Sequence, residues 1–303
     1  MKQEGPYFAR ATRAHNLVVR QKKKILRLYY ILKSVTSWYL LGGRFFFKRY
    51  CQALLNGHKW CFIVGCNNSG TSVLNKIFSQ MESFSCLEYE GHFYTRVLRR
   101  ANKKGHERVW TEYLSELKVD REWPLNNLPR LVHDWVENMR VPLRENFVEK
   151  TPANTVRMLW LDKAFPQSYF IGVVRNGYAV CEGIMRKGGK DAARAATHWN
   201  LVNRILIDNS SKVRNFLLIK YEDLTEKPDA VAATVAEFLG VGEGLFLNAM
   251  KTSFSFETIL GQRTMPIRNL NPQSIRKLKE KDLETIRDNA SEMLDYFSYD
   301  ANL

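Results

Sequence analysis

Residues 61–78 read CFIVGCNNSGTSVLNKIF and join an apolar run to a helical pattern through a glycine-containing turn. The run CFIVG is almost wholly apolar, which is typical of a strand that is buried on both faces. In the segment that follows, Val73, Leu74, Ile77 and Phe78 recur at the spacing of one helix face. The stretch therefore predicts a buried strand, a tight turn and a helix.

The turn nearly matches the phosphate-binding loop G-x-x-x-x-G-K-[ST]. Gly65 and Gly70 have four residues between them, but Thr71 occupies the position of the phosphate-binding lysine. The glycines let backbone N–H groups turn inward, and the start of a helix adds unpaired donors and the positive end of its dipole. The alternative is an ordinary strand–turn–helix without a ligand. We predict an anion cradle made of Asn67, Asn68, Ser69, Gly70, Thr71 and Ser72.

Strands and helices alternate along the rest of the chain. Apolar runs predict strands within 83–94, 146–165, 168–185 and 215–224, and helical patterns follow two of these strands and fill 192–209 and 229–240. Residues 92–145 are rich in Arg, Lys and Trp and are interrupted by prolines, so we expect an irregular insert over the site. This order predicts an α/β fold of three layers, α/β/α, around a central parallel sheet.

Positive charge is concentrated at the N-terminus. The 303 residues carry a net charge of +15, and residues 1–58 hold 12 Lys and Arg against one acid. We therefore predict a basic, mainly helical extension over 1–58 and an α/β domain over 59–303 that contains the 92–145 insert. Helices packed against the core are one interpretation of the extension, and a membrane-surface or acidic-partner patch is the other. Nucleic acid is not expected as a partner.

The sequence predicts no transmembrane helix and no signal peptide. Within the extension the longest uncharged run, Ser34 to Gly43, has ten residues, which is too short to span a bilayer. No clear cleavage site follows the long basic region. The five cysteines form no C-x-x-C pair, so reduced thiols are expected. We predict a cytoplasmic protein, with peripheral membrane contact through the basic segment left open; the pattern does not indicate an oligomeric state.

Polar residues follow several predicted strands at the point where each ends. Sites in parallel sheets form at the carboxyl ends of the strands. This rule gathers the cradle with Glu88, Glu90, Lys150, Arg175 and Tyr221. An anion loop beside acids and cations suits the transfer of a negatively charged group to a nucleophile.

The motifs resemble those of sulfotransferases that use 3′-phosphoadenosine 5′-phosphosulfate (PAPS). The first motif of that family is roughly G-x-x-[RK]-S-G-T-[ST], which residues 65–72 match except at Asn68. The family's E-K-[ST]-P pattern and its strand-end arginine are similar to EKTPANTVRMLWLDKAFPQSYFIGVVRNGYAV, residues 149–180. HWNLVNRIL and LIKYEDLTEKPDAVAATVAEFLG resemble two later segments of the family. The resemblance runs in order over about residues 62–240.

The resemblance implies specific roles. The cradle residues Ser69 to Ser72 would hold the 5′-phosphosulfate, Arg175 would hold the 3′-phosphate and Tyr221 would lie near the adenine. Glu90 corresponds to the general base, a role for which Glu88 and His92 compete. The donor would be PAPS without a metal, and the acceptor a hydroxyl or amine of a small molecule or carbohydrate.

Two departures from the family pattern bear on the charge of the donor site. Asn68 stands where the family usually has Arg or Lys, and Gly183 stands where it usually has a serine on the 3′-phosphate. An asparagine can donate hydrogen bonds but supplies no charge. From the sequence, Lys150 is the nearest motif-matched cation for the missing charge, and Arg186 is a candidate to replace the serine.

Two other classes of function remain open from the sequence. A P-loop kinase or NTPase would use Asp223 as its acidic Mg²⁺ ligand and would need the metal. A non-catalytic basic protein that binds membranes or polyanions would keep a degenerate cradle, and its binding would weaken steeply with salt.

Overall fold

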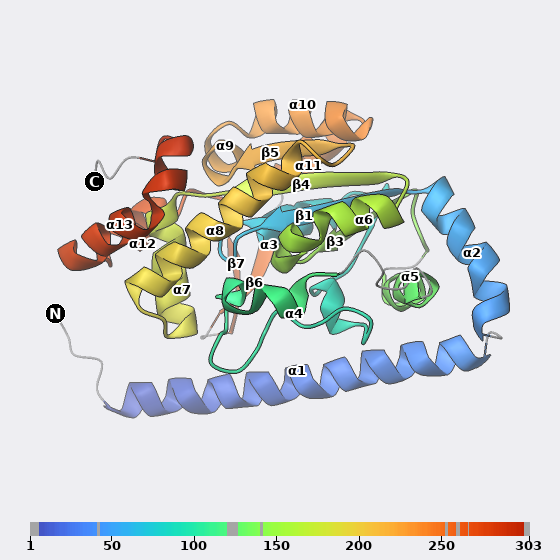
Figure 1. The fold of residues 1–303 in the computed structure, drawn as a ribbon, viewed down its shortest axis with the longest axis horizontal. Helices are drawn as coiled ribbons and strands as arrows, with labels where there is room; N and C mark the ends of the chain where they lie inside the picture. The colour runs from blue at the N-terminus through green and yellow to red at the C-terminus, as the bar shows by residue number, and fades with distance from the viewer. Residues whose placement is uncertain are drawn as a thin grey trace.

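A parallel sheet of five strands, in the order β2-β3-β1-β4-β5, forms the centre of the molecule (Figure 1). The computed structural model describes residues 6–40, 43–119, 127–139, 142–251, 254–258, 261–265 and 267–299. The strands are β1 Lys59–Gly65, β2 Phe84–Cys86, β3 Asn146–Lys150, β4 Ser168–Val174 and β5 Phe216–Lys220. The predicted α/β class with a central parallel sheet is confirmed. The second strand is shorter than expected and ends two residues before Glu88.

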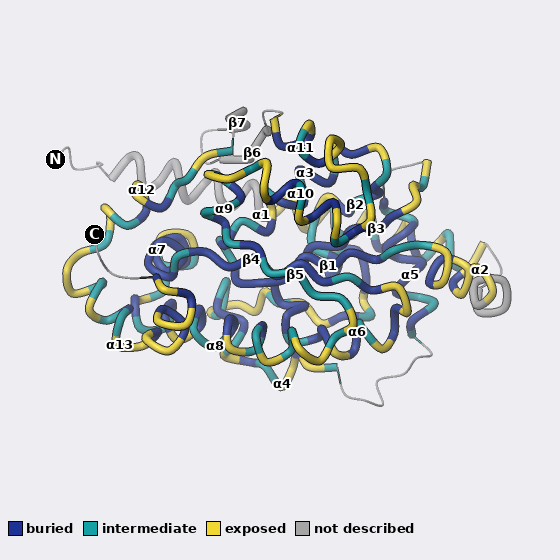
Figure 2. Tube along the Cα trace, turned by 90° about the horizontal axis from the view of Figure 1, so that it is seen from above, coloured by how far each residue is buried: buried dark blue, intermediate teal, exposed yellow. Residues whose placement is uncertain are grey.

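Helices cover both faces of the sheet, as the view in Figure 2 shows. On one face lie α3, α9, α10 and α11, and on the other lie α4, α6, α8 and α13. The bounds of the helices of the domain body are α3 Thr71–Phe78, α4 Leu114–Leu117, α6 Met158–Ala164, α7 Gly177–Gly188, α8 Ala192–Ser210, α9 Tyr221–Glu226, α10 Pro228–Leu239, α11 Glu243–Lys251, α12 Asn271–Ile275 and α13 Glu280–Tyr296. The predicted three-layer arrangement is therefore present.

The position of β1 at the centre of the sheet, with both faces buried, explains why the sequence of this strand is so apolar. Trp60, Phe62 and Val64 point to one face and join the cluster that contains α5, whereas Cys61 and Ile63 point to the other face, beneath α3 and α10. All five side chains are at most 1% exposed. Burying a large apolar side chain contributes about 1.5–3 kcal/mol to the stability of the fold. The side chains of β1 therefore stabilise the packing of the helices on both faces of the sheet.

The strand register gathers the polar strand ends at one edge. Ile63 pairs with Lys150 of β3, Gly65 pairs with Val173 of β4, and Val174 pairs with Lys220 of β5. Because all these strands are parallel, the turns that follow them leave the sheet at the same carboxyl edge. The cradle, Lys150, Arg175 and Tyr221 therefore start from neighbouring positions.

The insert contains more regular structure than expected. It includes the 3₁₀ turns η1 Gly91–Phe93 and η2 Trp110–Tyr113 as well as α4 and α5, Leu128–Val136. The expectation of an irregular segment is wrong for α5, whose Leu131, Val132 and Trp135 are fully buried. Pro129 stands in the first turn of this helix, where the missing N–H costs nothing, so it begins the helix rather than breaking it.

Two helices precede the sheet. The first, α1 Pro6–Leu40, extends along the length of the molecule, and the second, α2 Gly43–Gly57, leads into β1 (Figure 1). The buried residues Cys51, Leu54 and Leu55 of α2 belong to the same cluster as Trp60, so α2 packs against the core. On α1, six large apolar side chains are exposed: Ile25, Leu28, Tyr29, Leu32, Tyr39 and Leu40. Among the described helices, none combines the length and apolar character that crossing a membrane requires.

The C-terminal part adds elements that the sequence patterns did not predict. The strands β6 Phe254–Thr258 and β7 Gly261–Met265 form an antiparallel pair separate from the central sheet. The helix α13 packs against α8 and buries Ile286, Ala290 and Leu294 in the cluster that surrounds α7.

Candidate active site

Two glycines shape the turn between β1 and α3. Gly65 has a φ of 137°, and a Cβ there would lie 2.4 Å from the Val173 carbonyl oxygen. Gly70 has a φ of 100° and precedes α3, and a Cβ there would lie 2.7 Å from the Tyr221 ring. Only glycine fits both the backbone conformation and the space. The N–H groups at the start of α3, around Thr71 and Ser72, have no partner within the helix, which leaves them available to an anion as the predicted cradle requires.

Several buried polar atoms of the cradle have no partner within the described part of the chain. They are Asn67 Oδ1, Asn68 Nδ2 and Ser69 Oγ, and Arg175 Nη2 shares this property. Thr71 is buried and Ser72 is exposed. Unpaired buried polar groups are rare in folded proteins because each costs about 1–3 kcal/mol. Three of the four atoms, Asn68 Nδ2, Ser69 Oγ and Arg175 Nη2, can donate, so their concentration here suits a ligand that accepts hydrogen bonds.

Arg175 is held rigidly at the end of β4. Its Nε donates to Asn271 Oδ1 at 2.7 Å and its Nη1 donates to the Asn68 carbonyl oxygen at 3.0 Å. The guanidinium lies 4.4 Å from the centre of the Tyr221 ring. With the side chain fixed and only 8% of the residue exposed, the unpaired Nη2 is ready to bind an anion.

A second group of residues fixes the partners of Arg175. Glu222 Oε1 accepts from Asn271 Nδ2 at 2.5 Å and from the Asn176 backbone N–H at 3.0 Å. The Tyr299 hydroxyl donates to Glu222 Oε2 at 2.8 Å. The start of α12, the start of α7 and the C-terminal end of the described chain are thus joined through one carboxylate. Asn271 carries no motif, and sequence reasoning missed it.

The Asn68 amide oxygen accepts hydrogen bonds from two cations that sequence reasoning also missed. Arg108 Nη1 donates to Asn68 Oδ1 at 3.1 Å, and Lys187 Nζ donates to the same oxygen at 3.2 Å. Arg108 comes from the insert and Lys187 from the last turn of α7, so no local spacing could have connected them with the cradle. Gly183 faces the Asn68 side chain, since a Cβ on this glycine would lie 3.1 Å from it. Arg186 is bound elsewhere and donates twice to Glu182.

A second group of polar side chains consists of Glu90, Lys150 and His92. Lys150 Nζ lies 3.5 Å from Glu90 Oε1, and His92 Nδ1 lies 3.6 Å from Glu90 Oε2. Burial alone would raise the pKa of Glu90, but the positive charges of Lys150 and its other neighbours outweigh burial and lower this pKa. Burial lowers the pKa of His92 to about 4. At neutral pH Glu90 is therefore ionised and His92 is neutral.

The loop that carries Glu90 is fixed by a buried carboxylate beneath it. Glu149 Oε1 accepts from the Gly91 backbone N–H at 2.7 Å and from the Thr151 hydroxyl, while Oε2 accepts from Asn154 Nδ2 at 2.6 Å. Burial raises the pKa of Glu149 above its usual value. Glu149 is completely buried and positions the start of η1, so it does not itself reach an acceptor.

Glu88 lies apart from this group. It is exposed, and its charge acts on Tyr30 and Tyr94 rather than on Lys150. The structure thus brings together the cradle, Arg175 and Tyr221 in one group and Glu90, His92 and Lys150 in another. The Tyr221 hydroxyl donates to the Arg268 carbonyl oxygen at 2.8 Å, so its ring forms a wall beneath Arg175.

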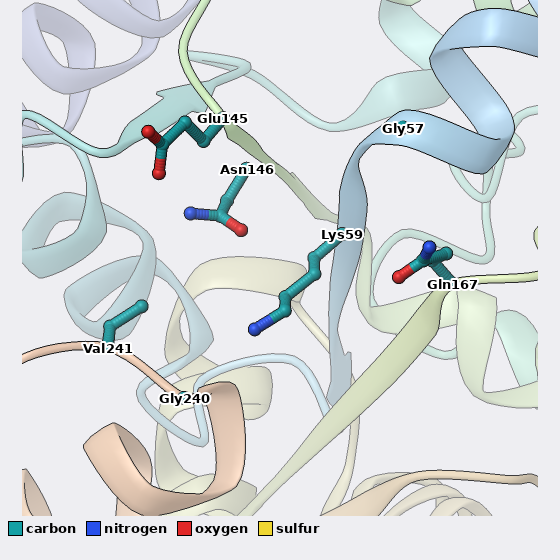
Figure 3. A pocket seen from close by; sticks show the side chains of 7 residues that line it. All are labelled: Gly57, Lys59, Glu145, Asn146, Gln167, Gly240 and Val241. Carbon is teal, nitrogen blue, oxygen red and sulfur yellow. The ribbon is translucent and has the colours of Figure 1, made fainter.

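A hollow of about 330 Å³ lies at the opposite end of the sheet (Figure 3). Lys59 at the start of β1 and Asn146 at the start of β3 line it, together with Glu145 and Gln167. The Lys59 amine donates to the Leu239 carbonyl oxygen. This hollow is separated by the length of the strands from the cradle, and we do not assign it to the active site.

Comparison with known protein families gives one match. The profile described as "Sulfotransferase family" matches residues 61–242, more than half of the chain. This interval contains the cradle, both sides of the site and the insert. No curated protein sequence matches the chain significantly.

Three solved structures share the fold. The sulfotransferase domain of the olefin synthase from Synechococcus PCC 7002 aligns with a TM-score of 0.54 and 20% identity, covering 81% of this chain and 96% of that one. Sulfotransferase STF9 from Mycobacterium avium aligns with a TM-score of 0.53 and 12% identity over 84% of this chain and 82% of that one. Sulfotransferase STF1 from Mycobacterium tuberculosis H37Rv aligns with a TM-score of 0.51 and 13% identity, covering 86% of this chain and 82% of that one.

Proposed function

Since the chain belongs to the sulfotransferase family, we propose that it transfers a sulfuryl group from PAPS to a hydroxyl or amine of a small-molecule or carbohydrate acceptor. The observation that carries this proposal is the set of unpaired buried polar groups at the cradle, Asn68 Nδ2, Ser69 Oγ and Arg175 Nη2. The three atoms come from the turn after β1 and from the end of β4. A ligand with phosphate-type oxygens, such as PAPS, would give these donors the partners they lack.

The donor side binds and orients in this proposal. The cradle N–H groups and the hydroxyls of Ser69 and Thr71 bind the 5′-phosphosulfate, and Arg175 binds the 3′-phosphate as a fixed guanidinium fork. Tyr221 lies against both Gly70 and Arg175, so its ring borders the nucleotide. Thr71 in place of a lysine suits a donor that has no transferring γ-phosphoryl group.

The acceptor side moves a proton. Glu90 takes the proton of the acceptor O–H or N–H as the acceptor's lone pair forms a bond to sulfur. In the same in-line step the bond from sulfur to the 5′-phosphate oxygen breaks, and adenosine 3′,5′-bisphosphate leaves with that electron pair. Glu90 suits this task because it is ionised and partly exposed, with Lys150 beside it. Lys150 pairs with Glu90, and from this position its charge stabilises negative charge on the transferring group.

The experiment has two readouts. Titration calorimetry should detect binding of adenosine 3′,5′-bisphosphate in the presence of EDTA, and mass spectrometry over a metabolite library with PAPS should detect products that have gained one sulfuryl group. A requirement for Mg²⁺ and ATP, without binding of the bisphosphate, would identify a P-loop kinase or NTPase instead. Binding of polyanions that weakens steeply with salt, without any turnover, would identify a non-catalytic protein.

A further inference from the structure

Asn68 has an unusual backbone that the neighbouring helix accommodates. Its φ is 67°, in the left-handed region, which asparagine tolerates better than most residues. Its side chain lies against Gly183, where a serine Cβ would approach it to 3.1 Å. The two departures from the family pattern therefore meet in one contact, because the absence of a side chain at 183 makes room for that of Asn68.

Arg108 meets Asn68 from the insert with an equally unusual backbone. Its φ is 66°, a conformation that a long side chain rarely adopts and that costs of order 1–3 kcal/mol. The loop around it is anchored to the region before α8, since Lys190 Nζ donates to the Gly105 carbonyl oxygen at 2.7 Å. Arg194 binds Glu112 with two hydrogen bonds of 2.7 and 2.8 Å. The surrounding structure thus holds a strained residue so that its guanidinium reaches the cradle.

Lys187 lies near three other cations, Arg108, Arg186 and Arg175, and little negative charge lies among them. It faces Arg186 and Glu182 on its own helix, Arg175 at the end of β4 and Arg108 in the insert. Glu182 already binds Arg186, so it neutralises the group only in part. Partial desolvation of its amine, and then these positive charges, lower the pKa of Lys187 to about 8, although the residue is exposed to solvent. Cations held this close are destabilising unless an anion joins them.

We infer that Arg108 and Lys187 supply the positive charge that position 68 lacks and that they bind the phosphosulfate end of the donor. Asn68 is the positioning residue, since its amide oxygen holds both cations beside the cradle in the free protein. This inference rests on the proposed function. Lys150, the candidate from the sequence, pairs with Glu90 and serves the acceptor side.

Arg108 and Lys187 have different neighbours, so we expect their substitution to change different quantities, the rate and the affinity. Arg108 lies within electrostatic reach of Glu90, so it stands toward the transferring sulfuryl group and the acceptor. Lys187 lies within electrostatic reach of Arg175 as well as of Arg108, so within the phosphosulfate it would bind the 5′-phosphate, which the bisphosphate keeps. Replacing Arg108 should therefore lower kcat more than it weakens bisphosphate binding, whereas replacing Lys187 should weaken bisphosphate binding.

The test measures calorimetric affinity for adenosine 3′,5′-bisphosphate and PAPS turnover in four variants. A lost charge-assisted hydrogen bond typically lowers affinity or rate roughly 10- to 100-fold. We expect this loss in affinity for Lys187→Gln and in kcat for Arg108→Gln, and Arg108→Lys should recover part of the rate. Arg186→Gln is the matched control, because it removes the same charge from the same helix at a residue that is bound to Glu182. It should change affinity less than threefold.

A rescue experiment separates charge from folding. In the double variant Arg108→Gln/Lys187→Gln, the further change Asn68→Lys should restore affinity at least tenfold, whereas Asn68→Met, of similar length without charge, should not. With Arg108 and Lys187 present, Asn68→Lys should raise affinity much less than it does in the double variant, because the positive charge is then already supplied. This dependence of the Asn68→Lys effect on the background is not expected from a structural role.

Two outcomes would overturn the inference. If Arg186→Gln weakened binding as much as Lys187→Gln, the effect would come from the general field and not from these positions. If both glutamine variants kept parental affinity and rate while the parent protein bound the bisphosphate and turned over, the charge would lie elsewhere and the proposed function would stand. A parent protein that did not bind the bisphosphate at all would instead remove the proposed function.

Discussion

At the amino end of the central sheet, Lys59 donates to the Leu239 carbonyl oxygen and lies over the Tyr169 ring, whereas at the carboxyl end Arg175 keeps one nitrogen unpaired. The amides differ in the same way. Asn146 and Gln167 at the amino end donate to backbone carbonyl groups at 3.1 and 2.8 Å. Among the described residues, the unpaired donors Asn68 Nδ2, Ser69 Oγ and Arg175 Nη2 lie together at the carboxyl end, whereas the hollow lies at the amino end (Figure 3), where Ser83 Oγ is unpaired but does not line it.

This difference shows what marks the site in this fold. A hollow whose polar groups are bonded to the protein offers little to a ligand, because binding would have to replace existing hydrogen bonds. Unpaired donors such as Asn68 Nδ2 and Arg175 Nη2 gain a full partner from an anion. The comparison predicts that substitutions at the carboxyl end change binding and turnover, whereas matched substitutions at the amino end change at most stability.

The largest expected effect comes from Glu90→Gln. A positioned general base typically contributes about 10²–10⁴-fold, so kcat should fall by this factor. Bisphosphate affinity should stay near normal, because Glu90 lies on the acceptor side. Steady-state kinetics on the acceptor found by the mass-spectrometric screen, together with calorimetry, measure the two quantities.

The controls for Glu90 come from both ends of the sheet. Glu145→Gln removes an exposed carboxylate beside the hollow, and Glu88→Gln removes an exposed one two residues away; both should leave kcat unchanged. Loss of turnover in Glu88→Gln or His92→Asn, with Glu90→Gln fully active, would assign the base to another residue. If none of the three matters, the acceptor is an amine that arrives deprotonated.

The next largest effect should come from Arg175→Ala. This change removes the unpaired Nη2 and the hydrogen bond to the Asn68 carbonyl oxygen together, so bisphosphate affinity should fall roughly 100-fold or more. Arg175→Lys, which keeps the charge but not the fork, should lose less. Thr71→Ala should also weaken binding, but more mildly.

Lys59→Ala is the control for Arg175→Ala at the amino end. It removes a hydrogen bond to Leu239 and a contact with Tyr169, so the melting temperature should fall while bisphosphate affinity stays the same. Equal affinity of Arg175→Ala and the parent protein would refute the assignment of the 3′-phosphate pocket. A loss of bisphosphate affinity in Lys59→Ala would show that residues at the amino end of the sheet also affect binding, which would contradict the distinction between the two ends.

Much of this arrangement can be read from the sequence because it is local. The apolar run of β1, the glycine turn and the helix α3 are contiguous, and the register of parallel strands brings Lys150 and Arg175 to the same edge. The fold class therefore agrees with the sequence-based expectation, whereas the assignment of the cradle, Glu90 and Lys150 to one active site stays a prediction. The family match agrees with the resemblance on which the residue roles were based.

The rest depends on tertiary packing. Arg108 and Lys187 lie 40 and 119 residues from Asn68, and no periodic pattern connects them with it. The helix α5 begins at a proline that also suggested a break, and β6 and β7 pair outside the main sheet. Glu88 and Glu90 are indistinguishable in a strand-end pattern, but the bond from Gly91 to Glu149 turns only Glu90 toward Lys150.

The smallest effect, and the most specific, should be a shift in pH dependence in Lys150→Met. In the parent protein burial would raise the pKa of Glu90, yet the charge of Lys150 is the largest of the influences that lower it, and the net pKa is below the usual value. Without Lys150 the effect of burial is opposed only by weaker influences, so the pKa of Glu90 should rise. Because the base acts in its ionised form, the acid limb of the kcat/KM profile should move to higher pH, and activity below neutral pH should fall more than activity above it.

Lys59→Met removes a lysine from the other end of the sheet and should leave this limb in place. A drop in rate by the same factor at every pH would show that Lys150 stabilises only the transferring group, and an unchanged profile with an unchanged rate would remove Lys150 from the acceptor side altogether.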